Sequence, residues 1–106
     1  MRKLYKFHWD CGRHGEVKCF FIEDDAVVKK CLGVRVYFGE ILGKHSEIFG
    51  KLEEHDLEVL TDDQNVIDII EKYIGKSFGH NPLNYLRADD GDELPEDFWD
   101  TKIADS

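Results

Sequence analysis

The 106-residue sequence predicts an α+β fold, a mainly antiparallel sheet of about five strands in the order ββαβββα with two helices and an acidic C-terminal segment. Apolar and polar side chains alternate with a period of two between residues 33 and 60, which is typical of half-buried strands. Apolar residues recur at helical spacing between residues 61 and 75. Acidic residues crowd the last part of the chain. We therefore expect a single domain over residues 1–86 and an acidic tail over residues 87–106.

Two strands are expected before the first helix, at residues 4–9 and 16–22. In the second strand, Phe20 and Phe21 are consecutive, so apolar side chains point to both faces. This pattern indicates a strand inside the sheet or one covered by a helix. The loop between them, at residues 10–15, is too long for a two-residue hairpin turn and is rich in glycine.

A short helix is expected to begin at Asp24 and Asp25 and to end at Gly33. The two carboxylates lie where the helix N-terminus is positive, and Lys29 and Lys30 lie near its negative C-terminus. The helix has only about two turns, so packing against the sheet must stabilise it.

The next three strands are expected at residues 34–38, 48–52 and 57–60. Short polar turns separate them along the chain. Consecutive strands joined in this way usually pair with each other, so we expect an antiparallel meander.

The clearest helix follows the third of these strands. Thr61 and Gln64 have the spacing of a capping box with Thr61 as the N-cap, and Gly75 ends the apolar run. We expect both helices to pack on one face of the sheet. The residues expected to share the buried face of this helix are Val66, Ile67, Ile70, Tyr73 and Ile74.

The formal net charge of −9 is unevenly distributed. Residues 87–106 hold eight acidic and two basic residues, a net charge of −6, which leaves −3 for the first 86 residues. This balance argues against direct binding to nucleic acid or to an anionic membrane, since both need a basic surface. It suits contact with a basic surface on another protein.

The location of the protein is predicted from its cysteines and its apolar runs. Three cysteines make no even disulfide framework and fit a reducing compartment. Residues 1–10 lack the uninterrupted apolar segment of a secretion signal, and no apolar run approaches the roughly 18 residues that span a bilayer. We expect a cytoplasmic protein that does not enter a membrane.

Four potential zinc ligands occur within twelve positions, namely His8, Cys11, His14 and Cys19. Their spacing matches no familiar zinc finger or ribbon, and Cys19 alternates with apolar residues of the second strand. A core role for Cys19 is therefore the favoured interpretation, and we expect neither a metal site nor a cofactor.

Two segments partly match motifs that carry catalytic chemistry. Cys11 lies beside Arg13 and His14, and nearby positive charge lowers a thiol pKa, but the arginine is not where a phosphatase-type loop places it. The segment GEILGKHS, residues 39–46, has one residue too few between its glycines for a P-loop, and a strand is expected after it. We assign no catalytic residue.

Three loops combine glycine with histidine, at residues 10–15, 43–47 and 79–83. If the fold brings them together, they would form a basic pocket able to hold a phosphate or a carboxylate. The opposing interpretation is that turns use glycine and polar residues in any case. The predicted ligand-binding residues of this pocket are Arg13, His14, Lys44, His45, Ser46 and His80.

The acidic tail contains a second candidate site. Residues 94–99 resemble a short docking peptide, with Phe98 and Trp99 as apolar anchors and Asp97 among the carboxylates that suit a basic rim. A short helix beginning at Pro95 would present these residues. The alternative is a tail that folds onto its own domain.

The segments KFHWDCGRHGEV and VYFGEILGKHSEIFGKLEEHDLEVLTDD resemble small accessory proteins of bacteriophages and some bacteria. The resemblance covers most of residues 3–86 and leaves the tail outside. It implies binding to a host component and brings no catalytic or cofactor-binding residue with it.

These observations favour a noncatalytic acidic binding protein, an inhibitor or regulator that engages another protein. The alternative is a protein that binds a small anionic ligand or nucleotide in the three-loop pocket, or a small enzyme there with His14, His45 and His80 as acid/base groups. A structural zinc module is the third hypothesis.

Overall fold

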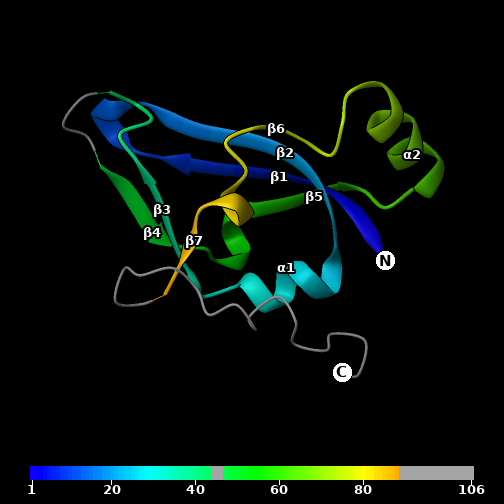
Figure 1. Ribbon diagram of the computed structural model, residues 1–106, viewed down its shortest axis with the longest axis horizontal. Helices are drawn as coiled ribbons and strands as arrows, with labels where there is room; N and C mark the ends of the chain where they lie inside the picture. The colour runs from blue at the N-terminus through cyan, green and yellow to red at the C-terminus, as the bar shows by residue number, and fades with distance from the viewer. Residues whose placement is uncertain (44–46, 89–106) are drawn as a thin grey trace.

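The structure, a computed structural model, describes residues 1–43 and 47–88. Within these ranges the chain forms two helices and two antiparallel sheets (Figure 1). The predicted α+β class is confirmed, but the single sheet of about five strands is wrong, because the described strands divide into a four-stranded and a three-stranded sheet. Residues 89–106 of the predicted tail, which include Asp97, Phe98, Trp99 and the short helix expected at Pro95, lie outside the described residues.

The four-stranded sheet is built around one long hairpin. Its strands are β1 (Arg2–Asp10), β2 (Glu16–Asp24), β5 (Leu57–Thr61) and β6 (Ser77–Gly79), in the order β5-β1-β2-β6. Phe7 stands opposite Cys19 in the hairpin, and a 3-10 turn at Gly12–His14 joins the two strands. The apolar residues on both faces of β2 are thus explained by its place inside the sheet.

The three-stranded sheet has β3 (Arg35–Gly39) at its centre, between β4 (Ile48–Lys51) and β7 (Leu86–Arg87). The predicted meander is therefore wrong at its third strand, because β5 pairs with β1 and not with β4. A 3-10 turn at Glu54–Asp56 redirects the chain between β4 and β5. It is capped by the Asp56 carboxylate, which accepts a hydrogen bond from the Glu53 N–H at 3.0 Å.

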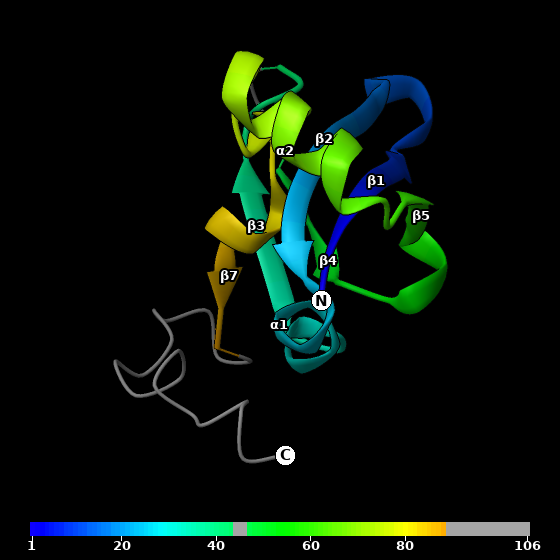
Figure 2. The same ribbon diagram turned by 90° about the vertical axis from the view of Figure 1, so that its right-hand side faces the viewer.

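The main core lies between the two sheets. Figure 2 shows β3 and β7 on one side of β1 and β2, with α1 (Asp25–Cys31) below them. Phe7 and Phe21 on the hairpin are fully buried, and Phe38 of β3 packs edge-on against Trp9 with ring centroids 5.5 Å apart. Alternation along each strand therefore leaves a second, outer face on both sheets.

Helix α2 (Gln64–Tyr73) packs on the opposite face of the four-stranded sheet from α1. Its fully buried Ile67 contacts Leu4 and Ile22 in a separate small cluster. The expectation that both helices share one face is wrong. The N-cap is Asp63 and not the predicted Thr61, which is held in β5. The Asp63 carboxylate accepts hydrogen bonds from the N–H groups of Asn65 and Val66, at 2.9 and 3.4 Å.

Residues 77–79 form β6 and cover the open edge of β2, so Gly79, expected at the start of a loop, is instead the last residue of a strand. Gly79 allows this close approach: its φ is +96°, and a Cβ there would lie 2.7 Å from the Lys18 carbonyl oxygen. No helix in the described part of the chain is long and apolar enough to span a membrane.

Candidate functional site

The structure brings two of the three glycine–histidine loops together in part. His14, in the turn between β1 and β2, lines a shallow hollow with Glu47, the residue just before β4. Arg13 is exposed in the same turn, whereas Lys44, His45 and Ser46 lie outside the described residues. The β1–β2 turn and the start of β4 are thus neighbours.

His80 does not line this hollow. Its ring lies edge-on to Phe38 and to Tyr85, with ring centroids 6.3 Å apart in both pairs. Aromatic packing against the core therefore accounts for its position. The pocket lining near His14 also includes Asp10 and Glu47, whose carboxylates oppose the binding of an anion.

The chemistry of Cys11 does not suit a nucleophile. Partial burial and the nearby Asp10 carboxylate raise the pKa of the Cys11 thiol, so the thiol is protonated near neutral pH. The Asp10 carboxylate itself accepts a hydrogen bond from the Gly12 N–H at 2.9 Å. Neither basic residue of the turn offsets these effects.

The histidines and cysteines that suggested zinc lie on different surfaces. His8 is on the outer face of the hairpin, where its Nε2 lies 2.8 Å from the Glu16 carboxylate, and Cys19 is buried on the inner face. Burial raises the pKa of Cys19 to about 12. Among residues 1–43 and 47–88, no three side chains of the metal-binding types gather in one place.

The outer face of the hairpin carries charges that satisfy one another. Glu16 accepts from Lys18 at 2.9 Å as well as contacting His8, and these partners lower the pKa of the Glu16 carboxyl group. A hollow beside them is lined by both signs of charge, including Lys6 and Glu58. This surface therefore shows no excess charge that would select a ligand.

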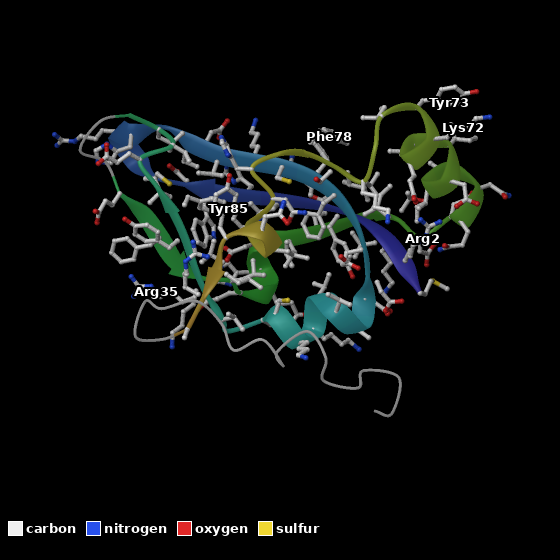
Figure 3. All side chains as sticks on the ribbon, viewed as in Figure 1. Arg2, Arg35, Lys72, Tyr73, Phe78 and Tyr85 are labelled. Atoms are coloured by element: carbon white, nitrogen blue, oxygen red, sulfur yellow. The ribbon has the colours of Figure 1, made fainter. Side chains whose placement is uncertain are left out.

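Helix α2 carries the most exposed apolar surface on the described chain. Val66, Ile69 and Tyr73 follow one another at i, i+3 and i+7, and their exposed fractions are 40%, 57% and 74%. Ile74 at the end of the helix is 62% exposed. Figure 3 shows Tyr73 pointing away from the body of the protein. We call Val66, Ile69 and Tyr73 the α2 stripe.

Apolar surface continues from α2 onto the neighbouring sheet. Phe20 and Phe78 face each other across β2 and β6, and their rings stack with centroids 5.1 Å apart. Phe20 lies two residues from Ile22 on the same face, next to the part that α2 covers. Phe78 is 38% exposed, and its side chain points outward in Figure 3.

Arg2 and Gln64 hold α2 in place at the start of β1. The Arg2 guanidinium forms ion pairs with Asp68 and Glu71, which lie about one turn apart on the helix. The Gln64 side-chain amide donates to the Arg2 carbonyl at 2.8 Å. The helix is therefore presented in one orientation, although few of its side chains enter a core.

Sequence reasoning missed the α2 stripe because it assigned Val66, Tyr73 and Ile74 to a buried face. Ile69 gave the available signal, since it lies outside that face on a helical projection. The apolar positions of this helix therefore cover more of its circumference than one contact with a sheet requires.

Comparisons of this chain with protein-family models, curated proteins and solved structures found no match. The exposed surfaces of the protein are therefore the available guide to its function.

Proposed function

We propose that this protein is a noncatalytic cytoplasmic binding protein, an inhibitor or regulator that engages another protein through helix α2. The α2 stripe is the observation that carries the proposal: Val66, Ile69 and Tyr73 form an apolar line along a helix that projects from the body. Exposed apolar surface of this kind is typical of protein interaction sites.

The partner is expected to offer an apolar groove with a basic rim. A helix that binds in a groove uses anchors at i, i+3 or i+4 and i+7, which is the spacing of the stripe. Asp62 and the N-cap residue Asp63 precede the helix, and Asp68 within it keeps its side chain 65% exposed while pairing with Arg2. Together with the net charge of −9, these carboxylates favour a positively charged partner and speed the encounter.

Two further observations support binding over catalysis. The Cys11 thiol has a raised pKa, and the hollow near His14 contains two carboxylates where an anionic ligand would need cations. The resemblance to phage accessory proteins points to the same kind of work, the binding of a host component.

Affinity capture with the full chain tests the proposal. Immobilised wild-type protein, the variant I69S/Y73S and the control V59S are exposed to the same lysate; Val59 is 48% exposed on β5, away from α2. We expect one protein to be retained by the wild type and by V59S and to be lost from I69S/Y73S. Its capture should also weaken at high salt, because the carboxylates contribute.

Retention of that protein by I69S/Y73S would contradict the proposal. Circular dichroism of each variant shows whether the fold is intact. Sedimentation of the wild type alone shows whether α2 binds a second copy of the chain, which would equally contradict it.

A further inference from the structure

The outer face of the three-stranded sheet carries a row of three cations. Arg35 on β3 stands directly opposite Lys51 on β4 and Arg87 on β7. Val36, the next residue, is fully buried in the core, so alternation places Arg35 and its two partners on the outer face. The row crosses all three strands of the sheet.

These cations lack compensation within the described ranges. Like charges directly opposite on neighbouring strands repel each other. None of the three side chains has a carboxylate partner among residues 1–43 and 47–88, and the Arg35 Nε is buried there without an acceptor. Within the described part of the chain, the Arg87 guanidinium donates only to the neighbouring carbonyl of Leu86, at 2.9 Å. The face is therefore suited to an acidic group.

Aromatic side chains lie beside the row. Tyr37 and Phe49 stack with centroids 6.3 Å apart, and the Arg35 guanidinium carbon lies 5.1 Å from the Phe49 ring centroid. Phe49 is 54% exposed, and a hollow of about 420 Å³ opens between Arg35 and Lys51. Figure 3 shows Arg35 on the outer side of the sheet, with Tyr85 nearer the body. This face thus suits an acidic chain that carries an aromatic side chain.

The face is also polarised along its strands. Burial raises the pKa of Tyr37, and so does the Glu47 carboxylate, which carries a negative charge nearby and accepts a hydrogen bond from the Tyr37 hydroxyl. Glu47 therefore marks the acidic end of the face, and Arg35, Lys51 and Arg87 mark the basic end. The basic end is where β7 finishes.

We propose that this face binds the acidic C-terminal residues of the same chain, 89–106. This segment begins two residues after Arg87 and holds eight acidic residues and one basic residue. Strands in a sheet are about 4.8 Å apart, so Lys51 is about 10 Å across the sheet from Arg87. Four extended residues cover about 13 Å, enough for the first acids to reach the row.

The order of residues in the segment matches the order of features on the face. Asp89, Asp90, Asp92 and Glu93 come first, close to the cations, and Phe98 and Trp99 follow at a distance that allows contact with Phe49. Covalent linkage gives the segment an effective concentration of about millimolar, so weak individual contacts suffice.

Single-stranded nucleic acid is the other polyanion with planar rings that such a face would accept. The net charge of −9 disfavours it, because the protein repels a phosphate backbone except at this one row. Residues 89–106 belong to the same chain, so their binding to the row does not require a separate polyanion to approach an acidic protein. The proposal is independent of the function proposed for α2.

Paramagnetic relaxation in the full chain tests the proposal. A spin label is attached at A104C in a C11S background, since Cys19 and Cys31 are buried. We expect the amide resonances of Tyr37, Phe49 and Lys51 to lose intensity, and that of Ile69 on α2 to keep it. The loss should disappear in R35Q/K51Q and at high salt, and should persist in the control K72Q, which removes a cation from α2 instead.

Three other outcomes of this experiment would overturn the proposal. Equal intensities across both surfaces, or loss at Ile69 in place of Phe49, would show that the segment does not bind this face. Loss seen only when labelled and isotope-enriched chains are mixed would assign the contact to a second copy. Saturable shifts of Tyr37 and Phe49 with a single-stranded oligonucleotide, without intramolecular loss, would assign the face to nucleic acid.

Discussion

Arg2, at the start of β1, forms an ion pair with Glu71 near the end of α2, and this contact joins the first strand to the helix that carries the α2 stripe. The same guanidinium also contacts Asp68. Because only Ile67 of α2 is buried and Ile70 partly so, these charged contacts have an unusual share in orienting the helix.

Replacing Arg2 by Gln is expected to loosen α2 while leaving both sheets intact. The substitution removes both ion pairs and leaves Asp68 unpaired, while Glu71 keeps only Lys76, whose Nζ lies 4.0 Å from its carboxylate, among the described residues. Hydrogen exchange should become faster at the amides of α2 and stay unchanged in β1 and β2. K72Q is the matched control on the same helix, and equal exchange rates in R2Q and K72Q would contradict the role given to Arg2.

Ile67 and Ile69 provide a matched pair for stability. Ile67 is fully buried and Ile69 is 57% exposed, two residues along the same helix. Ile67→Ala should lower the free energy of unfolding by about 2–5 kcal/mol through lost burial and a cavity. Ile69→Ala should change it by less than about 0.5 kcal/mol. Urea unfolding measures both, and equal losses would show that the stripe is packed against the body.

Gly79 is expected to tolerate alanine worse than Gly33 does. Both have positive φ, but a Cβ at Gly79 would lie 2.7 Å from the Lys18 carbonyl oxygen, whereas at Gly33 it would meet open space. Gly33→Ala should cost about 1 kcal/mol through backbone strain, and Gly79→Ala should cost more and release β6 from β2. Thermal unfolding measures the difference, and equal costs would argue against this close pairing.

Thiol reactivity should separate Cys11 from the two buried cysteines. Burial raises the pKa of Cys19 to about 12 and that of Cys31 to about 11, so neither forms an accessible thiolate at pH 8. An aromatic disulfide reagent should titrate a single thiol in the native protein, slowly, since the pKa of Cys11 is raised too. C11S should show none until it is unfolded. Rapid reaction of Cys11 would contradict a raised pKa and would favour a nucleophilic role for this thiol.

Glu16 predicts one part of the pH dependence of stability. Its contacts with His8 and Lys18 lower its pKa in the folded protein below the ordinary value of 4.5. A lowered carboxyl pKa stabilises the fold fully above pH 4.5, and this contribution is lost as the pH falls from there through the folded pKa. In Glu16→Gln, the free energy of unfolding measured with urea should therefore fall less steeply below pH 4.5 than in the wild type.

Glu58→Gln serves as the control for this measurement. Glu58 lies on the same outer face, and its carboxylate joins no ion pair within the described part of the chain. If both substitutions changed the acid pH dependence of the free energy of unfolding equally, a specific contribution from Glu16 would be contradicted.

The local elements could be predicted from the sequence because their patterns are local. Alternation located β1 and β2, and acidic residues before an apolar run located both helices. The pairing of β5 could not be predicted, since it depends on how the turn at Glu54–Asp56 redirects the chain. Strand β6 is three residues long, too short for a period to be recognised, and depends on an unusual approach at Gly79.

The candidate surfaces were predictable to a smaller extent. A pattern of apolar residues shows that a helix has an apolar side but does not show whether a neighbour covers all of it, so Tyr73 was assigned to a core. The cation row at Arg35, Lys51 and Arg87 needs the strand register, which joins positions far apart in sequence. His14 and Glu47 are neighbours because the turn between β1 and β2 lies beside the start of β4. His80 is not part of this group, because its ring packs against Phe38.

The order of strands in the four-stranded sheet has a consequence for how the protein is made. β1 and β2 leave the ribosome before the strands that flank them, yet they occupy the two inner positions, and their neighbours arrive only with residues 57–61 and 77–79. Until then the nascent hairpin has two open lateral edges that favour pairing with other chains. Synthesis that stops before residue 77 should thus yield insoluble product, even though the hairpin itself is already complete.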